Sequence, residues 1–177
     1  MKPIIHTTQY PLPIFQFSFP QVVTKQDCID YRNEHPKSNN SNIAAWHSDY
    51  RTNEKTDKFN PLIDLVVNTC TDISTNYFNA PLAGNYKYVL DNLWIAMYEQ
   101  KDYTIRHAHF PSTFASCYYI EVDDQSSPIT FGVNKELSIQ PENGMLLIWM
   151  GIIPHMVAQT KKKRTCICMN IGMEKIV

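Results

Sequence analysis

The sequence predicts a mainly β domain with helices at its N-terminal end, an α+β chain whose strands form a sandwich or a barrel-like core. Two observations support this. At least six short β-branched or aromatic runs, separated by turn residues, fill residues 86–177, whereas helical periodicity is confined to residues 1–85. A length of 177 residues fits one domain. We therefore expect one domain, 1–177, in which residues 1–85 are a helical and irregular support region and residues 86–177 are the β core that carries the site.

The first element is a strand and the second a short helix. Residues 14–19 are an apolar stretch ended by Pro20, which is typical of an edge strand. Thr24 is a good N-cap residue with Asp27 three positions later, a variant of the capping box, so a helix should begin there. Pro36 should stop this helix.

The third element is the most regular helix of the chain. Asn60 can cap it, Pro61 suits the first helical position, and the apolar residues that follow recur near a 3.6-residue period. The helix should end near Asn79, ahead of Pro81 and Gly84. We expect its apolar face to pack against one sheet.

The strands follow after residue 86. Each run is rich in β-branched or aromatic residues, and turn residues such as those of segments 123–128 and 141–144 separate them. The predicted strands are residues 89–97, 114–122, 129–133, 145–149, 155–157 and 164–172.

Composition excludes several classes of function. Sixteen Lys and Arg against 17 Asp and Glu give a net charge of −1, so nucleic-acid binding is not indicated, although a local patch is not excluded. The sequence has neither a G-x-G-x-x-G nor a P-loop motif, which excludes dinucleotide-binding and P-loop enzymes. No apolar run approaches the ~20 residues of a membrane span, so no membrane association is expected. Five cysteines without a C-x-x-C pair favour a reducing compartment, the cytoplasm.

Histidines and one arginine are the candidate site residues. In extended backbone, His107 and His109 would point to the same face about 6.6 Å apart and can converge on one metal ion. His155, at the start of a later strand, can supply a third ligand. Arg164 begins the final strand, and arginine is the side chain that holds a carboxylate with two parallel hydrogen bonds. We expect the other three histidines, His6, His35 and His47, to be structural.

The order of these motifs resembles that of the Fe(II)- and 2-oxoglutarate-dependent oxygenases, and more narrowly the small phage and bacterial branch related to prolyl 4-hydroxylases. Residues 93–111 resemble a tryptophan-containing strand followed by K-G-D-Y and H-x-H-P. Residues 114–120, FASCYYI, resemble L-S-G-V-Y-Y-V. Residues 141–155 resemble P-x-x-G-x-L-x-x-F with a distal histidine, and residues 164–170, RTCICMN, resemble R-I-S-I-S-F-N.

This resemblance implies a double-stranded β-helix, that is, a jelly-roll or cupin-like barrel. It implies a dioxygenase, with hydroxylation as the expected reaction, that uses Fe(II), 2-oxoglutarate as cosubstrate and O2. The implied metal ligands are His107, His109 and His155, and the far carboxylate of 2-oxoglutarate would pair with Arg164. The resemblance also implies a tyrosine at the cosubstrate, with Tyr103 the first choice and Tyr118 the next. Asn170 shares the face of Arg164 by the two-residue period and could line the pocket.

The chain departs from the family at the metal signature. The usual pattern is H-x-D or H-x-E with a distal histidine, a facial triad of two histidines and a carboxylate. Here His109 stands where the carboxylate belongs, so it either replaces that ligand or lies beside the site. Lys101 and Cys117 also stand where the family tends to have glycine.

Two other functions remain open at this point. One is a three-histidine cupin-type dioxygenase that needs no 2-oxoglutarate, and the other is a non-enzymatic jelly-roll binding or virion-associated protein with a degenerate metal site. The substrate also stays open between a peptidyl proline, a free amino acid, a nucleobase and a small metabolite, and the oligomeric state is not predicted. If the protein is phage-encoded, the expected cytoplasm is that of the host cell.

Overall fold

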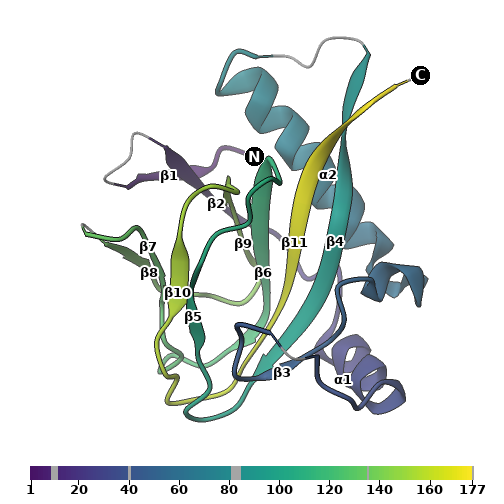
Figure 1. The fold of residues 1–177 in the computed structure, drawn as a ribbon, viewed down its shortest axis with the longest axis vertical. Coiled ribbons are helices and arrows are strands. Elements are labelled where there is room, and N and C mark those ends of the chain that lie inside the picture. The colour runs from purple at the N-terminus through teal and green to yellow at the C-terminus, as the bar shows by residue number, and fades with distance from the viewer. Residues whose placement is uncertain (9–11, 40, 81–84, 135, 177) are drawn as a thin grey trace.

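The computed structural model describes residues 1–8, 12–39, 41–80, 85–134 and 136–176 (Figure 1). The helices are α1 (Lys25–Glu34) and α2 (Asn60–Asn76), with the 3-10 turns η1 (Thr52–Glu54) and η2 (Asp57–Phe59). The strands are β1 (Ile4–Thr7), β2 (Pro13–Ser18), β3 (Trp46–His47), β4 (Tyr86–Tyr98), β5 (Thr104–His107), β6 (Phe114–Val122), β7 (Ile129–Phe131), β8 (Leu137–Ile139), β9 (Met145–Met150), β10 (His155–Val157) and β11 (Arg164–Lys175).

The strands form two antiparallel sheets. The large sheet has seven strands in the order β1-β2-β9-β6-β11-β4-β3, and the small sheet has four in the order β5-β10-β7-β8. Both helices lie on one face of the large sheet, and the small sheet lies over the other face (Figure 1). This jelly-roll architecture confirms the predicted fold class. Within the described residues, however, the strands form two separate sheets and not a closed barrel.

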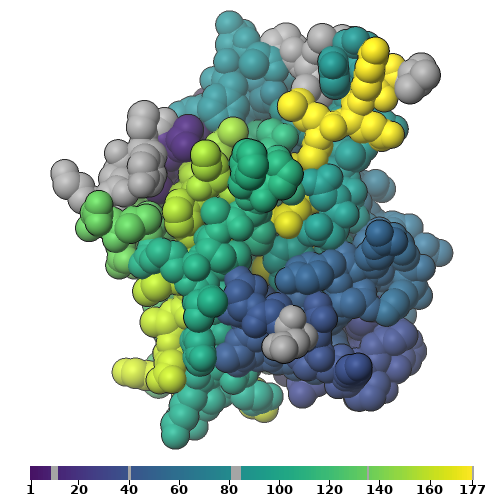
Figure 2. Space-filling view, viewed as in Figure 1, coloured from purple at the N-terminus to yellow at the C-terminus, as the bar shows by residue number. Residues whose placement is uncertain are grey.

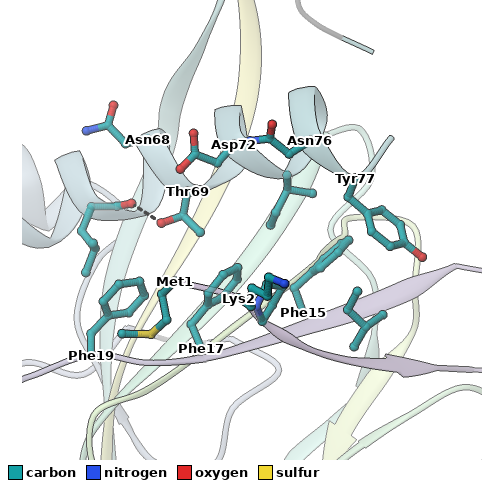
Figure 3. A pocket seen from close by; sticks show the side chains of 14 residues that line it. Met1, Lys2, Phe15, Phe17, Phe19, Asn68, Thr69, Asp72, Asn76 and Tyr77 are labelled. Carbon is teal, nitrogen blue, oxygen red and sulfur yellow. Dashed lines mark hydrogen bonds between the residues drawn. The ribbon is translucent and has the colours of Figure 1, made fainter. Parts of the chain in front are cut away.

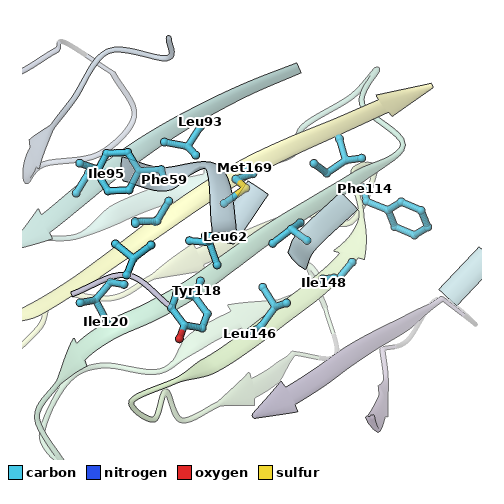
Figure 4. Close-up of a cluster of buried hydrophobic side chains, with 14 of the residues drawn as sticks. Phe59, Leu62, Leu93, Ile95, Phe114, Tyr118, Ile120, Leu146, Ile148 and Met169 are labelled. Carbon is cyan, nitrogen blue, oxygen red and sulfur yellow. The ribbon is translucent and has the colours of Figure 1, made fainter. Parts of the chain in front are cut away.

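The alternation of side chains along each strand of the large sheet builds two core layers. On β6, Phe114, Tyr118 and Ile120 join the layer between the sheet and the helices. Ala115, Cys117 and Tyr119 join the layer between the two sheets. The helix-side layer contains large apolar side chains from both helices and six strands, including Leu62, Leu93, Ile95, Leu146, Ile148 and Met169 (Figure 4). The helices therefore stabilise the sheet from behind and leave its other face to the site.

The helix predictions are confirmed, with a correction at α2. Thr24 caps α1, and the reciprocal hydrogen bonds of a capping box with Asp27 are both present. Asn60 is not the cap of α2, because a 3-10 turn leads directly into the helix and places Phe59 at the cap position. The helix also ends at Asn76, three residues before the predicted end. Pro81 and Gly84, which entered that prediction, lie outside the described residues.

The strand predictions are confirmed for all six runs of the β core, but four strands were not foreseen. These are β1, β3, β5 and β8, none longer than four residues. Because β1 pairs with β2 on the side opposite β9, the prediction that residues 14–19 form an edge strand is wrong.

The segment between α1 and α2 contacts one strand of each sheet. Its strand β3 pairs with β4, and Ile43 and Arg51 form isolated bridges with Thr104 and Leu93. Figure 2 shows this segment in blue beside the teal surface of β4 and β5. It closes one side of the space between the sheets. Neither helix of the described chain has the length and apolar character needed to cross a membrane.

Candidate metal centre

Three histidines converge at one end of the space between the sheets. His107 ends β5, His109 follows it by two residues, and His155 begins β10. His107 and His155 are direct partners in the β5–β10 ladder, so the strand pairing itself brings them together. The nearest ligand nitrogens of the three side chains all lie within 4.8 Å of one another.

Backbone carbonyls fix how two of these rings present their nitrogens. Nδ1 of His107 lies 2.9 Å from the carbonyl oxygen of Ile105, and Nδ1 of His155 lies 3.4 Å from that of Ile153. An Nδ1–H that donates to a carbonyl leaves Nε2 with a free lone pair, which is the tautomer that binds metals. The Nε2 atoms of His109 and His155 are 3.4 Å apart. Nitrogens bound to one ion at about 2.0–2.1 Å lie roughly 3.0–3.4 Å apart, so this pair already has the spacing of two ligands.

Burial keeps the three imidazoles uncharged. Desolvation, followed by the charge of His107, lowers the pKa of His109 to about 3. Desolvation also holds the pKa of His155 well below its ordinary value, and it lowers that of His107. Neutral rings at pH 7 are available as ligands without first losing a proton. In the described part of the chain, no carboxylate joins the group, so a metal bound here would have three nitrogen ligands.

Aromatic rings enclose the cluster. The ring of His109 lies 5.7 Å from that of Trp94, and the ring of His155 lies 4.8 Å from that of Trp149. His47, which is fully buried, stacks on Trp94 at 5.8 Å and so supports the wall of the site without being part of the cluster. These rings cover part of the cluster and restrict how the imidazoles rotate.

Arg164 lies on the face of β11 that points to the space between the two sheets, and it is buried. Its Nη1 donates to the carbonyl of Ser127 at 3.0 Å, and its Nη2 lies 3.5 Å from the hydroxyl of Tyr119. The guanidinium carbon lies over the rings of Tyr98 and Tyr119, at 4.9 and 5.1 Å. Nε has no partner, and none of the ion pairs among the described residues involves Arg164. A buried cation without a carboxylate is costly, so this position is suited to an anionic ligand.

A narrow cavity of about 30 Å³ connects the histidines to Arg164. The side chains of alternate residues along β11 form one wall, from Arg164 through Cys166 to Cys168, and Cys117 of β6 lies beside them. Its volume holds one or two waters. A longer ligand that reaches from the metal to Arg164 therefore requires these walls to move apart.

A second hollow, of about 470 Å³, opens to solvent on the outer side of the cluster. His107, His109 and Trp94 line it together with Phe110 and Asn170. Asn170 donates from Nδ2 to Oδ1 of Asn92 at 2.9 Å, and its own Oδ1 is buried with no hydrogen-bond partner in the described part of the chain. Asn170 thus lines the outer hollow and not the cavity at Arg164.

The two tyrosines predicted for the cosubstrate do not lie in the cavity. The prediction for Tyr118 is wrong because its side chain points to the helix side of the sheet, where its hydroxyl donates to the carbonyl of Pro20 at 3.2 Å (Figure 4). Tyr103 is 39% exposed and is not among the cavity residues. Tyr98 and Tyr119 contact Arg164 instead. Tyr98 is the direct partner of Arg164 in the β4–β11 ladder, a register that sequence alone does not provide.

A larger hollow lies elsewhere, between α2 and strands β1 and β2 (Figure 3). Its volume is about 570 Å³, and three phenylalanines of one strand and its extension, Phe15, Phe17 and Phe19, form its floor. The side chain of Met1 lies against this floor in Figure 3. Among the described residues, neither of the two clusters of metal-ligating side chains lines it.

No protein-family model matches the chain, and no curated protein matches it in sequence. Solved structures do match its fold. A prolyl-4-hydroxylase from Pseudomonas putida superposes with a TM-score of 0.67 at 12% identity, over 90% of this chain and 91% of the other. A prolyl hydroxylase from Trichoplax adhaerens, in complex with a peptide fragment of the hypoxia inducible factor oxygen degradation domain, gives 0.63 at 15% identity over 90% and 83%.

A third match is HygX from Streptomyces hygroscopicus, with nickel, 2-oxoglutarate and hygromycin B bound. It gives a TM-score of 0.63 at 9% identity, over 90% of this chain and 82% of the other. At identities this low, the superpositions show a shared fold and no more. It is the fold of proteins described as 2-oxoglutarate- and Fe(II)-dependent oxygenases.

Proposed function

We propose that this chain is a non-haem Fe(II)- and 2-oxoglutarate-dependent dioxygenase of the superfamily whose fold it shares, and that it hydroxylates its substrate. The observation that carries the proposal is the pairing of two features within one cavity. Three neutral histidines converge at one end, and a buried arginine without a carboxylate partner lies at the other.

His107, His109 and His155 would hold the iron, with His109 in place of the usual carboxylate. Bound iron and 2-oxoglutarate would supply the redox chemistry that activates O2. Arg164 would bind the far carboxylate of 2-oxoglutarate through the edge of the guanidinium that carries Nε, which has no partner among the described residues, and the hydroxyl of Tyr119 would assist it. The aromatic walls would keep water away from the reacting atoms.

The outer hollow would bind the substrate, because it reaches His107 and His109 from the solvent side. Its polar group with a free acceptor, Oδ1 of Asn170, could receive a donor of the substrate. A peptidyl residue and a small molecule both remain candidates, since the fold neighbours include a complex with a peptide fragment and a complex with hygromycin B.

Five unpaired cysteines support a reducing compartment, which we propose to be the cytoplasm.

The alternative dioxygenase, with three histidines and no cosubstrate, gives Arg164 no role. A buried guanidinium with no carboxylate partner among the described residues would then have no ligand to bind, so the structure favours the reading with 2-oxoglutarate. A binding protein with a degenerate site would not need three imidazoles whose ligand nitrogens converge on one point, so the geometry argues against this alternative as well.

The test is a visible absorption band that forms only when Fe(II) and 2-oxoglutarate are both bound. Fe(II) followed by 2-oxoglutarate, added to the full-length protein without oxygen, should give a weak visible charge-transfer band. The His155→Ala variant should lack the band. The control, His6→Ala, should keep it, because it removes an imidazole that is hydrogen-bonded to Gln16 and lies outside the histidine cluster. A folded wild-type protein that binds iron without forming the band with 2-oxoglutarate would refute the proposal.

A further inference from the structure

Three thiols form a second cluster of metal-binding side chains, one that an oxygenase reaction does not use. Cys117 of β6 is the direct cross-strand partner of Cys168 of β11, and Cys166 is two residues away on the same face. The three sulfur atoms lie within 4.8 Å of one another, and those of Cys166 and Cys168 are 4.0 Å apart. Cys117 and Cys166 are buried, and Cys168 is partly exposed.

The spacing of the sulfurs fits a common metal ion. Zinc–sulfur bonds are about 2.3 Å long, so sulfurs that share one zinc ion in trigonal or tetrahedral geometry are roughly 3.8–4.0 Å apart. The Cys166–Cys168 pair has this separation. The third sulfur needs to move by less than 1 Å, because no separation in the cluster exceeds 4.8 Å. A water in the adjacent cavity could complete a tetrahedron.

The charges of such a site would balance inside the protein. Three thiolates carry −3, a divalent ion +2 and the neighbouring Arg164 guanidinium +1, which gives a neutral assembly. The guanidinium, which has no carboxylate partner among the described residues, would then have a counter-charge.

We propose that Cys117, Cys166 and Cys168 form a second metal site, selective for a divalent d¹⁰ ion such as Zn²⁺, and that an ion bound there prevents 2-oxoglutarate from reaching Arg164. Each metal–sulfur bond replaces an S–H bond, and each proton leaves to solvent, so nothing is oxidised or reduced. Soft thiolates favour zinc-like ions over Fe(II), whereas imidazoles bind both kinds of ion. The second part rests on the proposed function, because the cavity between the thiols and Arg164 is where the cosubstrate would lie.

The first experiment uses Cd²⁺ as a spectroscopic probe for the thiols. Titration of reduced, metal-free, full-length protein should give a near-ultraviolet sulfur-to-cadmium charge-transfer band that saturates at one equivalent. The band should be lost in Cys166→Ala and in Cys168→Ala, the second being the milder change because Cys168 is only partly buried. It should persist in His155→Ala and in Cys28→Ala, which removes a buried thiol of the helix-side core. No band in the wild-type protein, or an equal band in either variant of the cluster whose circular dichroism shows a native fold, would overturn the site.

The second experiment measures 2-oxoglutarate affinity through the anaerobic Fe(II) band, with and without one equivalent of Cd²⁺. We expect at least a tenfold weaker affinity in the wild-type protein and no change in Cys166→Ala. Equal weakening in both proteins would place the cadmium at the histidines and overturn the exclusion. If 2-oxoglutarate does not bind at all, the proposed function fails while the thiol band still decides whether the second metal site exists.

Discussion

Replacing Arg164 with methionine separates the cost of this residue to the fold from its use in binding. Methionine is unbranched, uncharged and of similar volume, so it keeps the apolar packing of the arginine stem beside Tyr98 and Tyr119. Arg164 is 1% exposed, and its guanidinium makes one hydrogen bond of good length, 3.0 Å to the carbonyl of Ser127. The variant therefore isolates the charge with little change in packing volume.

The expected stability change is small. Removal of the guanidinium sacrifices a charge-assisted hydrogen bond, about 1.5–3 kcal/mol, and contacts with two aromatic faces at about 0.5–2 kcal/mol each. It also abolishes the desolvation penalty of a buried ion, which is several kcal/mol. These contributions nearly cancel, so the free energy of unfolding of the ligand-free variant should stay within about 2 kcal/mol of the wild-type value, or roughly 4–8 °C in Tm.

The effect on the cosubstrate is much larger. Removal of one partner from a buried charge pair costs about 2–4 kcal/mol, so the Kd for 2-oxoglutarate should rise roughly 30- to 700-fold. Urea unfolding and an anaerobic titration of the visible band measure the two quantities. Lys163→Met is the matched control, since this neighbouring side chain is 71% exposed and its pair with Glu99 should contribute at most about 1 kcal/mol. An unchanged Kd, or a variant that fails to fold, would show that the guanidinium is structural.

Three further results are expected. Because the pKa of His109 is about 3 in the folded protein and about 6.5 in the unfolded chain, the unfolded state takes up the proton first, so metal-free protein should lose stability as the pH falls below 6.5. The loss from His109 should reach about 2 kcal/mol at pH 5, and a Tm that is constant from pH 7 to 5 would contradict it. Tyr119→Phe should weaken 2-oxoglutarate binding by roughly 2- to 10-fold, because the Tyr119 hydroxyl faces Arg164. Tyr118→Phe should leave the binding unchanged, because its hydroxyl faces Pro20 instead. A larger effect of Tyr118→Phe than of Tyr119→Phe would contradict the assignment. Gly144→Ala should destabilise the fold by more than about 2 kcal/mol in urea unfolding, since φ is +77° and a Cβ would lie 2.5 Å from the carbonyl oxygen of Phe19; a neutral effect would mean that this turn can relax.

The sequence predicted the long elements well because their local signals agree with their tertiary roles. Strand β6 is mostly apolar and ends at an aspartate-rich turn, and its predicted bounds, residues 114–122, match the structure. Thr24 and Asp27 satisfy each other within α1, so that helix start needs no distant partner. Strands β5 and β8 were missed because three or four residues carry too little pattern, and only pairing with β10 and β7 makes them strands.

The site was predicted in part, for a related reason. Spacing alone placed His107 and His109 together, and the structure brings His155 to them through strand register. The choice between Tyr118 and Tyr119 depends on which face of β6 points between the sheets. Both residues are buried, because each face of this strand is covered, so hydrophobicity gives no alternation from which to assign the face. Register and facing are tertiary properties, and the errors lie there.

The two ends of the cavity are anchored to parts of the fold that differ in resistance to local opening. Arg164 belongs to β11, which is paired along its length with β4 and along most of it with β6. His107 and His155 belong to strands of four and three residues in the small sheet. In native-state hydrogen exchange, amides of β11 should therefore exchange only with global unfolding, whereas those of β5 and β10 should exchange through smaller fluctuations until a metal joins the strands. Exchange protection of these two short strands would then report metal occupancy directly, independently of any turnover.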